Sequence, residues 1–180
     1  SVCCFAAECS RMGLPIEYIE LNLSMKQCVQ MDLKDKVLYY LKKYDLKPEQ
    51  INLEITETAA NTAQDVVEDN IRALSEQGIS FSLDDYGTGY SNLSRIIDLP
   101  FSIVKIDKSM TDKVFDNKIH EILRYNIRLL KEIGMEVVVE GVETEEVLKQ
   151  FEELGCDFIQ GYYFSRPLPC QEFMGFMKMQ

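Results

Sequence analysis

The chain alternates between strand-like and helix-like segments from one end of its 180 residues to the other. Short apolar runs of the strand type recur six times, at 16–24, 51–57, 79–87, 102–107, 135–143 and 156–164. Helical patterns fill the intervals and cover both ends, over 2–13, 32–44, 65–78, 91–99, 117–134, 144–155 and 169–179. Repeated strand–helix units predict an α/β fold with a parallel sheet and right-handed crossovers.

Domain organisation follows from what separates these segments. Glycines stand where several predicted helices end, at Gly78, Gly134 and Gly155, and glycine readily adopts the left-handed conformation that stops a helix. No linker, low-complexity tract or composition shift interrupts the pattern, so residues 1–180 are predicted to form a single domain. The length supports a sizeable core, but it is short of the roughly 200–250 residues usual for an α/β barrel.

Polar residues near the carboxyl ends of the strands separate two possible architectures. Each predicted strand carries one such residue: Asn22, Glu54, Asp84, Lys105, Glu140 and Gln160. A barrel takes its active-site groups from many strand ends, whereas an open doubly wound sheet concentrates its site at one switch point. The pattern therefore favours a (β/α)8 TIM-like barrel, here incomplete with about six strands.

Charge and cysteine usage narrow the class of protein. The net charge of −11 argues against binding duplex nucleic acid, because such affinity comes from lysines and arginines that neutralise phosphates. An acidic protein that acts on a phosphate ester would need cations. The sequence contains no apolar run long enough for a membrane span, and its six cysteines are expected to be reduced thiols in a cytoplasmic protein.

The segment SLDDYGTGYSNL at 82–93 is the strongest local signal. Adjacent carboxylates at Asp84 and Asp85 repel each other unless a cation or a proton neutralises them. Four further carboxylates stand at strand ends: Glu54, Glu57, Glu140 and Glu143. Together with Asn22, this set of hard oxygen ligands indicates a site for two Mg²⁺ or Mn²⁺ ions, which suits displacement at phosphorus.

Six motifs in order identify a family. The segments LNLS, LEITET, DDYGTGYSNL, IVKIDKSM, VVVEGVET and CDFIQGYYFSRPLP resemble the signature of EAL-type cyclic di-GMP phosphodiesterases. The resemblance covers nearly the whole chain, roughly from Ile16 to Pro169. It implies hydrolysis of one phosphodiester of cyclic di-GMP to give linear pGpG in bacterial second-messenger signalling.

The resemblance also implies a role for each site residue. Asn22, Glu54 and Asp84 match ligands of a first metal ion, with Asp84 bridging to a second ion that Asp85 and Glu140 also hold. Lys105 matches the lysine that holds the attacking water. The other expected roles are ordering of water and metal surroundings by Gln160, anchoring of the Asp-Asp-Tyr-Gly loop by Glu57, and support of the site by Glu143.

The sequence departs from the family pattern at one point, and this departure leaves more than one functional hypothesis open. No Glu-Ala-Leu occurs in the 180 residues, although in the family this motif supplies a metal ligand on a strand preceding those seen here. The resemblance thus predicts an EAL domain truncated at its amino end, with doubtful activity for this chain alone. Three readings stay open: part of an active phosphodiesterase, an inactive module that binds cyclic di-GMP or a protein partner, and a fragment whose strand edges drive dimerisation. A homodimer and fused sensory or GGDEF domains in the parent protein are further expectations.

Overall fold

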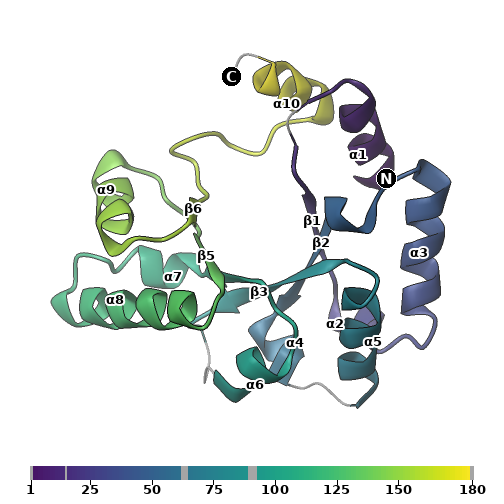
Figure 1. The fold of residues 1–180 in the computed structure, drawn as a ribbon. Helices are drawn as coiled ribbons and strands as arrows, with labels where there is room; N and C mark the ends of the chain where they lie inside the picture. The colour runs from purple at the N-terminus through teal and green to yellow at the C-terminus, as the bar shows by residue number, and fades with distance from the viewer. Residues whose placement is uncertain (1, 15, 62–64, 89–92, 179–180) are drawn as a thin grey trace. The chain divides into compact units, whose positions relative to one another are not determined.

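A computed structural model of the chain describes residues 2–14, 16–61, 65–88 and 93–178. Six strands run in sequence order, and neighbours in that order are hydrogen-bonded: β1 (Ile19–Asn22), β2 (Ile51–Thr56), β3 (Ser80–Tyr86), β4 (Ile103–Ile106), β5 (Glu136–Val139) and β6 (Phe158–Ile159) (Figure 1). The ladders β1–β2, β3–β4, β4–β5 and β5–β6 are parallel. The expected α/β fold with parallel strands is confirmed.

Helices follow the strands, as a parallel connection requires. Ten are described: α1 (Val2–Arg11), α2 (Met25–Cys28), α3 (Leu33–Tyr44), α4 (Glu57–Asn61), α5 (Asp65–Ser75), α6 (Leu93–Asp98), α7 (Lys108–Thr111), α8 (Asn117–Glu132), α9 (Glu145–Leu154) and α10 (Cys170–Met177). A short 3₁₀ turn, η1 (Pro48–Gln50), precedes β2. In the part of the chain that the structure describes, no helix combines the length and apolarity needed to cross a membrane.

The chain divides into two compact units, and each is described by itself. Unit 1 comprises residues 1–54, 63–81 and 167–180, and unit 2 comprises residues 55–62 and 82–166. The prediction of a single domain over 1–180 stays a prediction.

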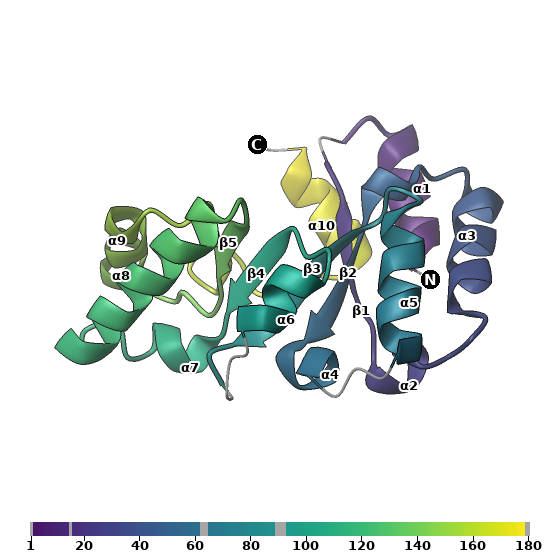
Figure 2. The same ribbon diagram turned by 60° about the horizontal axis from the view of Figure 1, so that its bottom comes forward.

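In unit 1, α3 and α5 lie side by side and bury their apolar faces (Figure 2). Leu33 and Leu41 of α3 are buried, and so are Val67, Ile71 and Leu74 of α5, at the spacing of one helical face. The amide of Asn70 on α5 donates to the carbonyls of Cys28 and Gln30, at 2.8 and 2.9 Å. These two hydrogen bonds connect α5 to the end of α2 and the residues that follow it.

In unit 2, the core forms around β4 and β5. All four residues of β4 are buried, as are Val137, Val138 and Val139 of β5, which is typical of parallel strands covered on both faces. Helix α8 packs on β5 and α9 through the buried residues Leu123, Ile127 and Leu130 (Figure 1). Asp116 caps α8 by accepting hydrogen bonds from the amides of Lys118 and Ile119, at 2.8 and 3.2 Å.

Several predicted boundaries differ from those observed. The last strand is much shorter than 156–164, and β5 ends at Val139, so Glu140 and Gln160 each follow a strand directly. Glu57 begins α4 instead of ending β2. The short helices α2, α4 and α7 were not predicted, since one turn is too brief to show an apolar period. The start of the helix predicted over 91–99 lies outside the described residues.

Helix stops at glycine are confirmed. Gly78, Gly134 and Gly155 have φ of 92°, 87° and 76°. Gly155 is the C-cap of α9 and donates to the carbonyl oxygens of Phe151 and Glu152. The left-handed conformation therefore ends these helices where the sequence predicts.

Candidate active site

Asn22 and Glu54 are neighbours at the strand ends of unit 1. They are register partners in the parallel β1–β2 ladder, and the amide of Leu23 donates to the carbonyl of Glu54 at 2.8 Å. Glu54 is only 5% exposed, whereas Asn22 is exposed. Paired residues in parallel strands point to the same face of the sheet, so an amide and a carboxylate stand together there.

Asp84 and Asp85 occupy an irregular stretch of β3 in unit 2. The β3–β4 register shifts between Leu83 and Tyr86, as a bulge produces. Asp85 has a left-handed backbone with φ of 59°, a conformation that aspartate tolerates better than most residues. The amide of Asp85 donates to Oδ1 of Asp84 at 3.0 Å. This irregularity interrupts the regular alternation of side chains between the two faces of the sheet at Asp84 and Asp85, the adjacent carboxylates predicted to bind metal.

Lys105 and Glu140 form an ion pair at the ends of β4 and β5. The Nζ of Lys105 lies 2.8 Å from Oε1 of Glu140, and the two side chains are 4% and 20% exposed. The backbone amide of Glu140 donates to the carbonyl of Ile106 at 3.0 Å. An ammonium this deeply buried requires a charged neighbour, because the desolvation cost of an isolated charge is large. The strand ends of unit 2 therefore hold a buried cation beside a carboxylate.

Glu57 contacts the loop that follows β3. Its Oε2 accepts a hydrogen bond from the amide of Gly87 at 3.3 Å, and the side chain is buried. Gly87 has φ of 97°, which a residue with a Cβ would adopt at a cost. Burial raises the pKa of the Tyr86 phenol, and the nearby Glu57 carboxylate raises it further. The described part of the loop, up to Thr88, is thus fastened at Gly87, while residues 89–92 lie outside the described residues.

Glu143 lies in the turn that follows β5, and Gln160 directly follows β6. Oε1 of Glu143 accepts from the ammonium of Lys108 at 2.8 Å, and Lys108 also pairs with Asp112 at 3.1 Å. Hydrogen bonds to these two carboxylates raise the pKa of Lys108. The backbone of Gln160 joins the two strand ends, because its amide donates to Val139 at 2.8 Å and its carbonyl accepts from Val142 at 3.1 Å.

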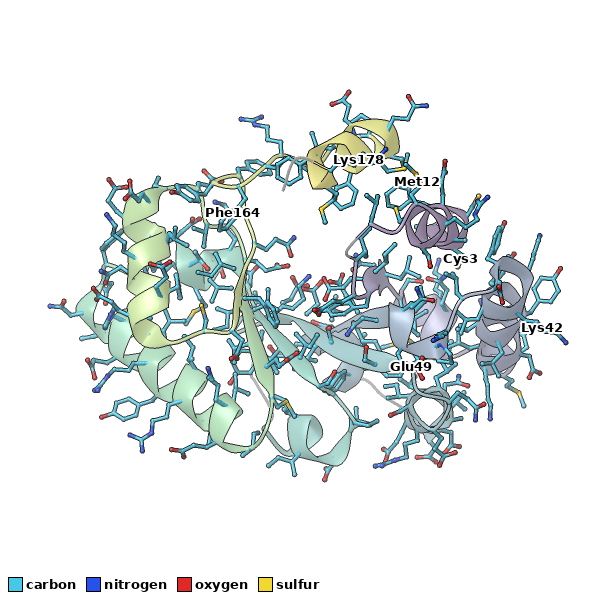
Figure 3. The ribbon with its side chains drawn as sticks, turned by 45° about the horizontal axis from the view of Figure 1, so that its top comes forward. Cys3, Met12, Lys42, Glu49, Phe164 and Lys178 are labelled. Carbon is cyan, nitrogen blue, oxygen red and sulfur yellow. The ribbon has the colours of Figure 1, made fainter. Side chains whose placement is uncertain are left out.

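Aromatic residues follow Gln160. Tyr162, Tyr163 and Phe164 are each between 42% and 54% exposed, and Figure 3 labels Phe164 in this loop. The guanidinium of Arg166 lies 5.1 Å from the ring centre of Tyr162. This distance is within the range of a cation–π contact.

The donor set fits a hard divalent cation. Within the described ranges, no three histidine, cysteine, aspartate or glutamate side chains are close enough together to hold a metal ion. Asn22 and Glu54 belong to unit 1, and Asp84, Asp85 and Glu140 belong to unit 2. The chemistry of the set is nevertheless that of magnesium or manganese ligands, since every donor is an amide or carboxylate oxygen. The adjacent carboxylates of Asp84 and Asp85 add a local need for positive charge.

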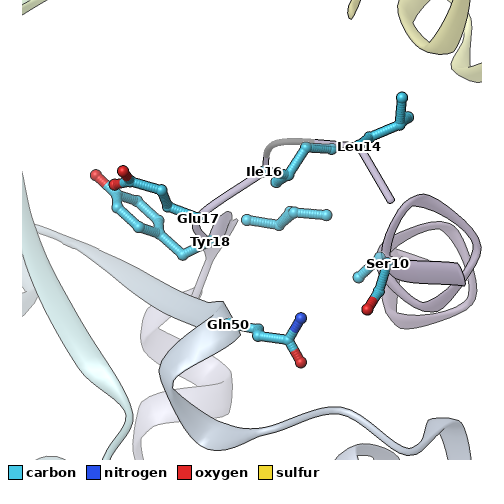
Figure 4. Close-up of a pocket in the computed structure, with 8 residues that line it drawn as sticks. Ser10, Leu14, Ile16, Glu17, Tyr18 and Gln50 are labelled. Carbon is cyan, nitrogen blue, oxygen red and sulfur yellow. The ribbon is translucent and has the colours of Figure 1, made fainter. Parts of the chain in front are cut away.

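Two cavities in unit 1 are too small for a dinucleotide. The pocket in Figure 4 holds about 90 Å³ between α1 and β1, with Ser10, Tyr18 and Gln50 among its lining residues. A second cavity of about 260 Å³ lies between the first two strands and α3, and Asn22 lines it. Sites for drug-sized ligands usually measure about 300–1,000 Å³. A third cavity of unit 1 holds about 300 Å³ and is lined by Phe5, Tyr18 and Phe173 among others, but none of the expected site residues lines it.

Lys108, Gly141 and Gly161 are not among the site residues that the sequence predicts. Each lies inside a motif of the family resemblance, but the contacts that it makes depend on packing between segments far apart in the chain. The signal that could have found the glycines is their position directly after Glu140 and Gln160. Lys108 carried no such signal.

Comparison with known proteins assigns this fold and these motifs to a class, the EAL domains. The EAL domain family matches residues 1–167, and the chain belongs to that family. The oxygen sensor protein DosP of Escherichia coli K12 is 34% identical over 95% of this chain and 22% of its own length. The cyclic di-GMP phosphodiesterase RocR of Pseudomonas aeruginosa is 32% identical over 93% of this chain and 43% of its own length.

Solved structures agree with this assignment. The PaMucR phosphodiesterase in complex with c-di-GMP has a TM-score of 0.88 and 32% identity, covering 96% of this chain and 70% of that chain. The Klebsiella pneumoniae BlrP1 complex with calcium and cyclic di-GMP has a TM-score of 0.82 and 28% identity, covering 91% of this chain and 42% of that one. The chain spans 22% and 43% of the lengths of the two curated relatives above.

Proposed function

We propose that this chain belongs to a cyclic di-GMP phosphodiesterase that hydrolyses one phosphodiester of its substrate to give linear pGpG. The observation that carries the proposal is the buried pair of Lys105 and Glu140 at the strand ends of an EAL domain. A buried lysine is well suited to hold a water molecule and to offset negative charge on a phosphate. The function of the RocR relative and the c-di-GMP complex of PaMucR support the choice of substrate.

Each of four residues of the chain has a separate proposed role in the hydrolysis. Lys105 orients the attacking water and stabilises charge that develops on the phosphate. Glu57 holds the Asp-Asp-Tyr-Gly loop through the amide of Gly87, so the backbone around Asp85 keeps its left-handed turn. Gln160 orders water near the reacting phosphate, and Glu143 supports the turn that carries Glu140.

Two divalent cations, Mg²⁺ or Mn²⁺, complete the proposal. Asn22, Glu54 and Asp84 would hold one ion, and Asp84, Asp85 and Glu140 would hold the other. Bound in this way, the ions would lower the pKa of a water molecule and neutralise phosphate charge. The oxygen-only donor set supports the assignment, and so does the calcium in the BlrP1 complex.

An inactive module that binds cyclic di-GMP or a protein partner is the second candidate. The observation behind it concerns this stretch of sequence alone: its 180 residues contain no Glu-Ala-Leu and so supply no counterpart of one ligand of the family pattern. Without that ligand, this chain would hold a metal ion less precisely, and a misplacement of about 1 Å can cost on the order of 10²-fold in rate. We therefore propose that this chain alone hydrolyses the substrate poorly.

The test compares two proteins under the same conditions. The 180-residue chain and a chimera that adds strands with Glu-Ala-Leu-x-x-Arg from an active EAL domain are incubated with cyclic di-GMP and Mn²⁺, and pGpG is followed by chromatography. We expect the chimera to be faster by about 100-fold or more, and to lose activity on Lys105→Met. Comparable turnover by both proteins would refute the poor activity of the chain alone. A folded chimera that binds the substrate without cleaving it would support the inactive module.

We also propose a location, an oligomeric state and further domains for the protein. The domain acts in the cytoplasm, where cyclic di-GMP signalling takes place, and it assembles as a homodimer. Because the chain spans only part of the relatives, sensory or GGDEF domains are proposed to be fused to it in the parent protein. Light scattering of the purified chain tests the homodimer.

A further inference from the structure

The turn that follows β5 is held from two sides. On the β6 side, the amide of Val142 donates to the carbonyl of Gln160 at 3.1 Å, and the amide of Tyr163 donates to the carbonyl of Val142 at 3.0 Å. Gly161 makes this approach possible, because a Cβ there would overlap the backbone of Val142. Hydrogen bonds and close backbone packing therefore hold the turn 140–143 against residues 160–163.

On the other side, the turn is held by Lys108. Gly141 has φ of 73°, and a Cβ built on it would overlap the methylene carbons of Lys108, so the lysine stem lies directly against the turn. At the far end of the same side chain, the ammonium pairs with Glu143 at 2.8 Å and with Asp112 at 3.1 Å. One side chain thus covers Gly141 and holds the residue two positions later.

We propose that Lys108 is a positioning residue for Glu140, acting through the turn 140–143. Glu140 immediately precedes Gly141, and its carboxylate lies 2.8 Å from Lys105. The hydrogen bond from the amide of Glu140 to the carbonyl of Ile106 holds the backbone on the strand side of Glu140. The direction of the Glu140 side chain then depends on the backbone conformation at the start of the turn 140–143. Lys108 fixes that conformation, because its methylene carbons lie against Gly141 and its ammonium pairs with Glu143. The inference deepens the proposed function, because Lys105 and Glu140 are central to it.

The two parts of the Lys108 side chain predict different effects on substitution. Lys108→Met keeps most of the stem but loses the ammonium, so it frees Glu143 while the cover over Gly141 stays. Lys108→Arg keeps a cation and a stem and should restore the position of Glu143. Lys149→Met is a matched control, because Lys149 pairs with Glu145 at 2.7 Å on the surface of α9 in the same unit.

The test uses nuclear magnetic resonance of the 180-residue chain without metal or nucleotide. The probes are the Cε–H signals of Lys105 and the amide exchange rates of residues 141–143. In Lys108→Met, we expect exchange to accelerate about fivefold and the Lys105 signals to move toward their positions in Glu140→Gln. Lys108→Arg should resemble the parent protein, and Lys149→Met should change neither probe.

A double variant separates positioning from a general loss of stability. If Lys108 acts through Glu140, adding Lys108→Met to Glu140→Gln should leave the Lys105 signals where Glu140→Gln put them. A further shift of similar size in the double variant would overturn the proposal. So would unchanged exchange in Lys108→Met, or an equal acceleration in Lys149→Met. Because neither probe needs substrate, a chimera that fails to hydrolyse cyclic di-GMP would count against the proposed function alone.

Discussion

The ammonium of Lys105 lies 2.8 Å from the carboxylate of Glu140, and both side chains are largely removed from solvent. Their attraction opposes the desolvation cost of each charge, and removal of one partner leaves the other charge buried. The pair therefore has consequences for stability as well as for the proposed chemistry.

Glu140→Ala is expected to destabilise the protein by about 3–5 kcal/mol, the usual cost of removing one partner of a buried ion pair. The double variant Lys105→Met/Glu140→Leu, which removes both charges, should recover most of that loss. Urea unfolding followed by circular dichroism measures both. The exposed pair of Lys149 and Glu145 is the control, and Glu145→Ala should cost less than about 1 kcal/mol. Equal losses at the two pairs would contradict the prediction.

Glu57→Ala should loosen the loop after β3 while the protein stays folded. The amide of Gly87 would lose its carboxylate acceptor, and its exchange should accelerate about tenfold. Hydrogen exchange with mass spectrometry over 85–88 measures this change, and Glu132→Gln on the surface of α8 serves as a control. Unchanged exchange at Gly87 would make Glu57 an ordinary buried carboxylate.

Asp157 should make the stability of the protein depend on pH in the acid range. Partial burial disfavours its charged form, but hydrogen bonds from Lys131 at 2.7 Å and from the amide of Val137 at 2.9 Å outweigh that effect and lower its pKa. A lowered pKa stabilises the folded state above the unfolded value of about 3.9, and this stabilisation disappears as the pH falls through the folded value.

Asp157→Asn should consequently cost about 1 kcal/mol at pH 7, a small figure because Lys131 is partly exposed. The difference from the parent protein should shrink as the pH falls below about 4, since the aspartate is then protonated as well. Thermal unfolding at a series of pH values shows the trend. A difference that stays constant down to pH 2 would argue that Asp157 acts through shape alone.

Cys156 should be alkylated more slowly than the exposed cysteines. Burial and the neighbouring Asp157 raise its pKa to about 11, so its thiolate fraction at pH 8 is about 100-fold below that of a thiol with the reference pKa. Cys4 and Cys170 are exposed and should react first with iodoacetamide. Peptide mass spectrometry over time gives the three rates. Rapid labelling of Cys156 in folded protein would show that its surroundings open readily.

Millimolar Mn²⁺ should raise the melting temperature if the proposed ligands bind it. At a concentration ten times the dissociation constant, binding stabilises the folded state by about 1.4 kcal/mol. Asp84→Asn should abolish the shift, and Glu132→Gln, which lies on a surface helix, should preserve it. A melting curve that does not respond to Mn²⁺, although Asp84→Asn alone moves it, would indicate a structural role for Asp84.

The order of strands and helices could be predicted because it rests on local patterns. Apolar spacing placed α3, α8 and α9 within about two residues of their observed ends. Left-handed glycines follow α8 and α9, whereas Asp45 takes the left-handed conformation after α3. The length of β6 could not be predicted from its strand-forming residues. It is set by pairing with β5, which involves only Phe158 and Ile159 of β6. The single turns of α2, α4 and α7 likewise depend on their surroundings.

The sequence by itself determined the family and the residues that stand at the strand ends, because motif spacing and strand position are written along the chain. Tertiary structure alone decided which of these residues meet. Lys108 reaches Glu143 across 35 positions, and Gly87 donates to Glu57 across 30. The left-handed conformation of Asp85 is likewise seen only in the folded chain, where it coincides with the shift of register between β3 and β4. Contacts between distant residues are set by packing of whole elements, and no local pattern records which side chains that packing brings within reach.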